Sequence, residues 1–114
     1  MKSKNVLIIG GGISGCGAAR LSCKLGYNTF LTTTSKIEKN QKKMLIDAGV
    51  NFSEGAHYFS YLTNIDLIIK SPGVSPRIPF LIEAKKQKIP ILSELEFAFI
   101  NTESYVIAIT GTNG

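Results

Sequence analysis

The sequence has little that points to metal binding or to disulfides. Its 114 residues include two cysteines and one histidine, and no CxxC pair is present, which argues against a zinc site. On a helix, Cys16 and Cys23 would lie about 10 Å apart at 1.5 Å per residue, beyond the roughly 7 Å that a disulfide spans. We expect His57 to be a surface loop residue. The sequence therefore predicts no metal ligands.

Long apolar runs are also missing. Nothing approaches the roughly 20 consecutive apolar residues that a membrane helix needs. The apolar stretch at residues 6–9 runs into glycines at once, so it is too short for the core of a secretory signal. Hydrophobic residues make up 44% of the chain and charged residues 18%. This composition predicts a globular, cytoplasmic protein with no membrane partner.

Arginine is scarce although the net charge is +5. The only arginines are Arg20 and Arg77, and no aromatic residues alternate with the lysines. Proteins that read nucleic acids usually rely on arginine and on stacking aromatic side chains. We therefore expect the lysines to solvate exposed helix faces, and we expect no nucleic-acid partner.

Short β-branched apolar runs alternate with helical segments along the chain. Strands are expected at residues 6–9, 28–34, 50–52, 65–69, 89–92 and 105–110. Helices are expected at residues 16–25, 36–48, 80–88 and 93–100, with a loop and short helix at residues 54–63. This alternation predicts an α/β, Rossmann-like, doubly wound sheet of about five mostly parallel strands, with helices on both faces.

Two local signals fix helix ends within this pattern. Ser93 is expected to cap the last helix, with Glu96 completing a capping box three residues later. Gly49 is expected to stop the helix that precedes it. The polar residues 101–104 form a candidate domain boundary.

The first glycine loop follows the first strand and opens the first helix. Gly10, Gly12 and Gly15 match the G-x-G-x-x-G pattern, in which the second glycine lets a diphosphate approach the backbone. The free N–H groups at the start of the helix favour an anion. The loop therefore predicts nucleotide or anion binding.

The end of the second strand bears on which nucleotide binds. A dinucleotide site usually has an acidic residue there to hold the ribose hydroxyls, whereas this chain has Thr32, Thr33, Thr34 and Ser35. For NADP the nearest cation is Lys36. An NAD(P)-binding module of a dehydrogenase or regulator is disfavoured by this pattern but stays open as the alternative.

Two further loops follow apolar strands. Ser71, Pro72 and Gly73 stand at the carboxyl end of the fourth strand, where ligands bind in open parallel sheets, and Gly73 has the freedom to take a positive φ. The final residues form a second glycine loop after the apolar run from Tyr105 to Thr110. That loop begins like a phosphate-binding loop and consists of Gly111, Thr112, Asn113 and Gly114.

Together these segments resemble the Mur ligases. The resemblance rests on KNVLIIGGGISG, IIKSPGVSPRIP, ILSELEFA and AITGTNG, in this order and over nearly the whole chain. It implies a UDP-sugar-binding, Rossmann-like domain at residues 1–93. Residues 94–114 would be the linker helix, first strand and truncated P-loop of a central ATPase domain. The chain is thus interpreted as a fragment of a longer enzyme.

The resemblance also implies site residues. The UDP-sugar contacts would come from Gly12, Ile13, Ser14, Gly15, Thr33, Thr34, Ser71, Pro72 and Gly73. The partial ATP site would be Gly111, Thr112, Asn113 and Gly114. Thr33 departs from the family's usual acidic residue, which puts its contact with the base in doubt.

The implied reaction is ATP-dependent amide-bond formation in peptidoglycan synthesis, in the members that add D-glutamate to UDP-N-acetylmuramoyl-L-alanine. ATP and Mg²⁺ serve the parent enzyme, and they and D-glutamate would bind through other domains. No catalytic residue and no bound cofactor is expected in this chain, which would be inactive alone. A third possibility is a folded scaffold that binds nothing by itself. We also expect self-association through the apolar run from Tyr105 to Thr110, an unpaired strand template.

Overall fold

The computed structural model describes residues 4–101. The elements in chain order are β1 (Asn5–Ile9), α1 (Ile13–Lys24), β2 (Asn28–Thr33), α2 (Lys39–Ala48), β3 (Asn51–Glu54), the 3₁₀ turn η1 (Phe59–Leu62), β4 (Leu67–Lys70), α3 (Pro79–Lys86), β5 (Ile91–Ser93) and α4 (Glu94–Asn101). Across these residues, no helix combines the length and apolarity needed to span a bilayer. The strand expected at residues 105–110 and the loop at residues 111–114 lie outside the described residues.

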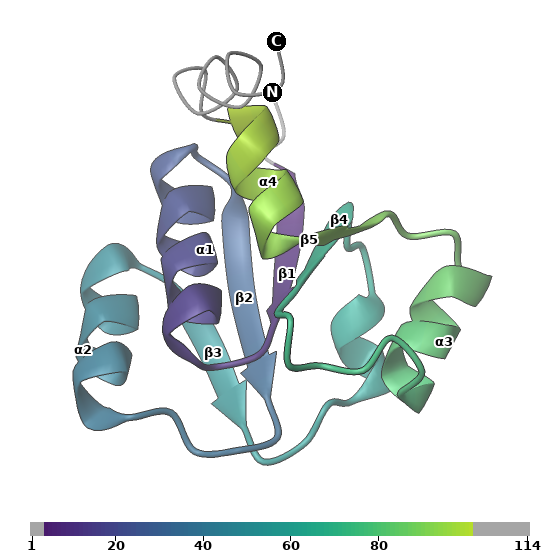
Figure 1. Cartoon of the computed structure of the whole chain (residues 1–114), viewed down its shortest axis with the longest axis horizontal. Coiled ribbons are helices and arrows are strands. Elements are labelled where there is room, and N and C mark those ends of the chain that lie inside the picture. Colours follow the sequence, from purple (N-terminus) through teal and green to yellow (C-terminus); the bar gives the residue numbers. More distant parts are fainter. Residues whose placement is uncertain (1–3, 102–114) are drawn as a thin grey trace, which may run out of the picture.

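The strands form one parallel sheet in the order β3-β2-β1-β4-β5. Because the order reverses at β1, the chain winds outward in both directions from the sheet centre, as the doubly wound prediction requires. Helices α1 and α2 lie on one side of the strands and α3 lies on the other (Figure 1). The predicted fold class is therefore confirmed.

Alternation along β1 builds two cores. Val6 and Ile8 face the side covered by α1, α2 and α4, where they pack with Ala19 and Phe97. Leu7 and Ile9 face the other side, where α3 and η1 contribute a second cluster that includes Phe80. The residues from Val6 to Ile9 are at most 1% exposed, which explains why this strand is apolar at every position.

Several helix ends behave as the sequence predicts. Ser93 and Glu96 form the reciprocal capping box at the start of α4, with N···O distances of 2.9 and 3.1 Å. Gly49 ends α2 in the left-handed conformation, with φ at 84°. Both cysteines lie on α1 and both are free.

Helix α1 begins three residues earlier than predicted. The sequence placed its start at Cys16, but the structure places it at Ile13 with Gly12 as the N-cap. The prediction was wrong because a glycine-rich stretch favours a loop. Here Gly15 lies inside the helix and is buried against the Gly10 carbonyl, so tertiary contact overrides local preference.

Candidate functional site

The loops that follow β1 and β4 meet at the point where the strand order reverses. Gly10 N donates to Thr32 O at 3.0 Å, and Ser71 N donates to Ile9 O at 3.0 Å. The ends of β2, β1 and β4 are thereby aligned at one edge, with α1 leaving to one face and the chain toward α3 leaving to the other. In open α/β sheets such a switch point is where ligands bind.

The three fingerprint glycines have different surroundings. Gly10 has φ at +116°, and a Cβ there would lie 2.4 Å from Ser71 Oγ. A Cβ on Gly15 would lie 2.0 Å from the Gly10 carbonyl oxygen. A Cβ on Gly12, however, would meet nothing within 4 Å. Gly10 and Gly15 are required by the fold, whereas Gly12 opens toward solvent at the helix N-terminus.

The loop after β4 has a buried part and an exposed part. Ser71 is buried beneath the glycine loop, and Lys70 Nζ holds the turn by donating to Ser71 O at 3.2 Å and Val74 O at 2.8 Å. Pro72 and Gly73 are exposed. Gly73 is not among the positive-φ glycines of the described residues, so the expected reason for a glycine there does not apply. An added Cβ at Gly73 would meet nothing within 4 Å.

The two threonines at the end of β2 differ in exposure. Thr33 is 4% exposed, and its hydroxyl lies 3.3 Å from both the hydroxyl and the backbone N–H of Ser35. Thr34 is exposed and lines a cavity described below. Thr33 therefore shapes the turn after β2, while Thr34 is accessible to a ligand.

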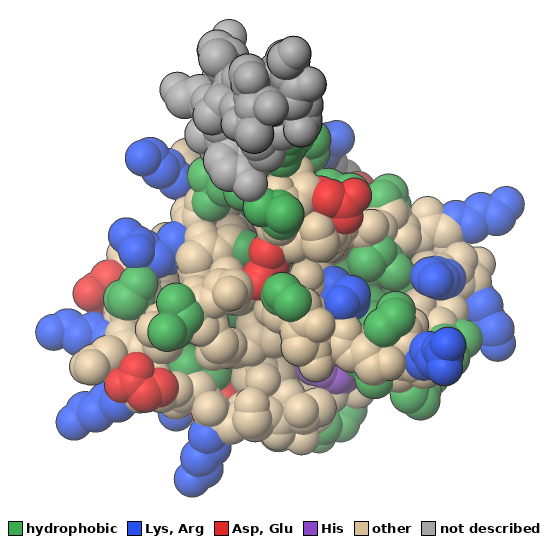
Figure 2. Space-filling view, in the orientation of Figure 1, with side chains coloured by type: hydrophobic (Ala, Val, Ile, Leu, Met, Phe, Trp, Pro, Cys, Tyr) green, Lys and Arg blue, Asp and Glu red, His purple; other side chains and the backbone are tan. Residues whose placement is uncertain are grey.

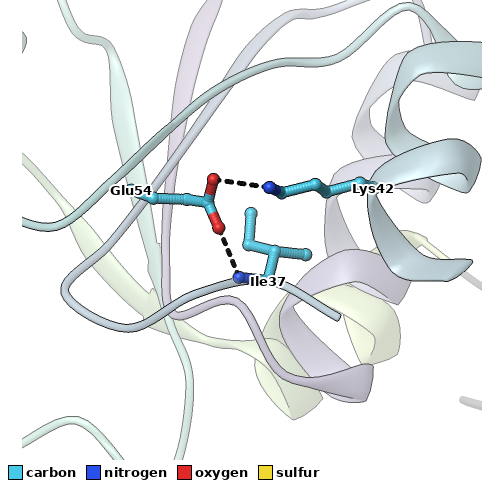
Figure 3. Close-up of polar contacts among 3 residues, drawn as sticks. All are labelled: Ile37, Lys42 and Glu54. Carbon is cyan, nitrogen blue, oxygen red and sulfur yellow. Dashed lines mark hydrogen bonds and ion pairs between the residues drawn. The ribbon is translucent and has the colours of Figure 1, made fainter. Parts of the chain in front are cut away.

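A carboxylate does lie beside this turn, but it comes from β3. Glu54 pairs in register with Thr33. Figure 3 shows its two oxygens engaged: Oε2 accepts from Ile37 N at 2.6 Å, and Oε1 lies 2.9 Å from Lys42 Nζ. The Ile37 N–H and then Lys42 lower the pKa of Glu54. This carboxylate ties down the loop between β2 and α2, so both its oxygens are occupied within the protein.

A cavity of about 510 Å³ opens between Thr34 and Gly73. His57, Phe59 and Phe80 contribute aromatic walls to it. His57 lies in the loop between β3 and η1, as predicted, and its ring is half-buried and packs 5.2 Å from the ring of Phe80. Its Nδ1 lies 2.9 Å from the Thr32 hydroxyl, and burial lowers its pKa.

A second cavity, of about 360 Å³, lies on the other side of the Pro72–Gly73 segment. Ser14 from the first turn of α1, Pro72 and Glu94 from the first turn of α4 all line it. The loop after β4 thus separates two hollows, one beside α1 and α4 and one beside α3.

The residues predicted for UDP-sugar binding divide into two groups. Buried members support the edge: Gly15, Thr33 and Ser71. Exposed members surround the helix N-terminus and the cavities: Gly12, Ile13, Ser14, Thr34, Pro72 and Gly73. The sequence reasoning missed His57, Glu54 and Glu94. Gly55, with φ at +103° just before the His57 loop, was the one local signal of a constrained turn.

Most lysine and arginine side chains lie around this region and not at its centre. Figure 2 shows lysine and arginine side chains mainly at the rim of the face, with uncharged groups dominating its centre. Within residues 4–101, no cluster of three or more His, Cys, Asp or Glu side chains is placed to hold a metal ion. The start of α1 presents backbone N–H groups at this edge, the kind of donor that binds anions at helix N-termini.

Comparison with curated proteins gives consistent relatives. The chain is 37% identical over 111 residues to the UDP-N-acetylmuramoylalanine–D-glutamate ligase of Bacteroides fragilis, covering 97% of this chain and 25% of that protein. It is 39% identical over 114 residues to the enzyme of the same name from Cytophaga hutchinsonii, covering 98% of this chain and 25% of the relative. The chain therefore spans about a quarter of the length of these relatives.

Solved structures support the fold. A murein peptide ligase from Psychrobacter arcticus superposes with a TM-score of 0.77 at 18% identity, covering 85% of this chain and 20% of that one. The UDP-N-acetylmuramate–alanine ligase MurC of Thermotoga maritima gives 0.73 at 19% identity, covering 90% and 23%. A family model described as the N-terminal domain of MurD-like Mur ligases matches residues 4–93. With the sheet, the glycine loop and the loop after β4 all in place, this chain belongs to the family of MurD-like Mur ligase N-terminal domains.

Proposed function

We propose that this chain binds UDP-N-acetylmuramoyl-L-alanine as the substrate domain of a ligase that adds D-glutamate in peptidoglycan synthesis. The observation that carries the proposal is the open Gly12 at the N-terminus of α1, where a diphosphate has free approach to backbone N–H groups. The names of the full-length relatives motivate the choice of substrate.

The exposed residues among those predicted for UDP-sugar binding would contact different parts of this ligand. Gly12, Ile13 and Ser14 would contact the diphosphate, and the side chain of Ile13, 80% exposed, would gain cover from the sugar nucleotide. Thr34 and Gly73 border the aromatic cavity of about 510 Å³, a suitable volume for a uracil ring. Thr33 and Ser71 would act from behind these groups by holding their loops, with Pro72 at the surface between the cavities.

The remainder of the reaction would belong to other parts of the enzyme. We propose a boundary after residue 93, with residues 94–114 leading into the ATPase domain and Gly111 to Gly114 beginning its phosphate loop. There the enzyme would activate the substrate carboxylate with ATP, and the amine of D-glutamate would attack. Mg²⁺, when bound, supplies charge stabilisation at the transferring phosphoryl group. We assign no catalytic group to residues 4–101, and place the enzyme in the cytoplasm with its nucleotide substrates.

The alternative of an NAD(P)-binding module has less support. Precorrin-2 dehydrogenase SirC shares the fold, with a TM-score of 0.57 at 12% identity. However, a ribose-binding carboxylate would have to come from Glu54, and both its oxygens are already bonded to Ile37 and Lys42.

Titration of the labelled protein with UDP-N-acetylmuramoyl-L-alanine tests the proposal. We expect amide shifts at Gly10 to Gly15 and at Ser71 to Gly73, and no displacement of the ligand by NADH. If those amides stay unmoved while the protein is folded, the binding assignment fails. Equilibrium dialysis of this chain beside a full-length ligase would then separate a scaffold completed by other domains from a domain that binds nothing.

A further inference from the structure

Glu94 carries a carboxylate whose two oxygens are buried, and within residues 4–101 it forms no ion pair. It is the first residue of α4, directly after β5, so it lies at the carboxyl edge of the sheet. Both of its carboxylate oxygens, and Ser71 Oγ, are buried without completing a hydrogen bond. Buried polar groups in native proteins are normally paired. An unpaired carboxylate at this edge therefore calls for a functional explanation.

The position of Glu94 relates it to the anion site. The cavity that it lines also includes Ser14, in the first turn of α1. Ser71 Oγ also lies close to the first turn of α1, because a Cβ added to Gly15 in that turn would be 3.1 Å from this oxygen. The carboxylate thus lies close to the positive end of the α1 dipole, where a bound diphosphate would also place its charge.

The charged and titratable groups around Glu94 do not cancel its charge. On α1, the pKa of Cys16 is raised by burial and then by the Glu94 charge. On β4, Lys70 is committed to two carbonyl groups of the following turn. Burial raises the pKa of Glu94, and the Ser71 hydroxyl and Lys70 offset only part of that effect. On α4 itself, Glu96 is engaged by Ser93 in the capping box.

We infer that Glu94 couples ligand binding to proton uptake: when a diphosphate occupies the α1 N-terminus, the Glu94 carboxylate takes one proton from solvent. The inference rests on the proposed function. Two negative charges that share one helix end repel each other, and protonation removes that repulsion. The neutral carboxyl group has an O–H that can donate to Ser71 Oγ, so protonation does not leave the two buried groups without a possible hydrogen bond. Glu94 is thus a residue that modulates affinity, not a catalytic one.

The direction of the pH effect follows from linkage. Ligand binding raises the pKa of Glu94 further, so affinity is greatest below the pKa of the free protein and falls as pH rises toward that of the complex. Replacing Glu94 by glutamine keeps the size and removes the charge. Glu94→Gln should therefore bind as the protonated wild type does, at every pH.

Calorimetric titration with UDP-N-acetylmuramoyl-L-alanine between about pH 5 and pH 8, in buffers of different ionisation enthalpy, tests this inference. At the upper end we expect Glu94→Gln to bind about tenfold tighter than wild type, equivalent to one unit of pKa change on binding. The variant should also lose the proton uptake. Glu83→Gln on α3 removes the same charge at a partly exposed position, where the carboxylate accepts a hydrogen bond from Gln87, and this variant should behave as wild type.

The outcomes separate the two proposals. Binding by wild type with no proton uptake, or with uptake that persists in Glu94→Gln, overturns the inference alone. Persistent uptake would point to His57, whose pKa is lowered by burial. Absence of binding in folded wild type overturns the proposed function, and the inference with it. Carbon NMR of the Glu94 carboxyl group, with and without ligand, reports the change of protonation directly.

Discussion

Gly12 and Gly15 stand three residues apart in one loop, yet the structure constrains them in opposite ways. A methyl group on Gly15 would overlap the Gly10 carbonyl, while one on Gly12 would meet empty space. The same division runs through the whole edge, with Gly15, Thr33 and Ser71 buried and Gly12, Thr34 and Gly73 exposed. A glycine that the fold needs is recognised by what surrounds it. The fold does not need a glycine at position 12, and we attribute that glycine to the proposed ligand, whose diphosphate would approach the helix N-terminus.

Gly15→Ala is the substitution that should damage the fold most. The obstacle is a backbone carbonyl at 2.0 Å, which cannot move without displacing β1 from α1. We expect unfolding free energy to fall by about 3 kcal/mol or more, a decrease in melting temperature of about 12 °C or more. Thermal denaturation followed by circular dichroism measures it.

Gly17→Ala on the same helix is the matched control for this change. Gly17 is exposed, and an added Cβ would meet nothing within 4 Å. Because alanine has the higher helix propensity, this variant should gain up to about 1 kcal/mol of stability. Equal effects of the two substitutions would refute the distinction between a crowded and an open glycine.

Gly10→Ala should cost less, about 2–3 kcal/mol, because part of its obstacle is a side chain. An added Cβ would lie 2.4 Å from Ser71 Oγ and 2.6 Å from Ser71 Cβ, at φ of +116°. Replacing Ser71 by glycine in the same protein removes the contact but leaves the unfavourable φ. The double variant should therefore recover part of the loss relative to Ser71→Gly. Full recovery would mean that the backbone conformation costs nothing, and no recovery would mean that Ser71 is not the obstacle.

Gly12→Ala should leave the fold intact and weaken ligand binding. Stability should change by no more than about 1 kcal/mol, the scale of an N-cap substitution. Affinity for UDP-N-acetylmuramoyl-L-alanine should fall about tenfold, or 1.4 kcal/mol, because the methyl group keeps the diphosphate from the backbone. Unchanged affinity in calorimetric titration would remove Gly12 from the site.

The same comparison explains what could be predicted from the sequence. The strands and the capping box at Ser93 and Glu96 were predictable, because each depends on residues that are neighbours along the chain. The early start of α1 was not, because Gly15 is helical on account of a contact with Gly10 that only the packed structure supplies. Motifs located both exposed and buried residues of the candidate site, whereas the burial of Gly15, Thr33 and Ser71 follows only from packing.

Glu54, His57 and Glu94 escaped the sequence reasoning for a related reason. The role of Glu54 depends on the register that sets it beside Thr33, and that of His57 on the distance between its loop and β2. The carboxylate oxygens of Glu94 are buried where α4 lies beside α1. Sequence patterns indicate which residues share a face of one element. They do not indicate which side chains from different elements meet at the end of a sheet.

Glu54→Gln is the mildest change and refines the comparison at the exposed rim. A Cβ on Gly11 would lie 3.0 Å from both Ile37 and Thr33, so the loop that Glu54 holds forms the outer wall of the glycine loop. Glutamine keeps an oxygen for Ile37 N–H but loses the charge that pairs with Lys42.

Because the pKa of Glu54 is lowered in the fold, the stabilisation that its carboxylate provides is present above the ordinary pKa of glutamate and is lost as pH falls through the lowered value. We expect a small decrease in melting temperature near neutral pH, which shrinks in acid and in high salt. Lys42→Met should produce the same salt-sensitive decrease, and a Glu54→Gln defect that persisted in acid would show that the ion pair is not its cause.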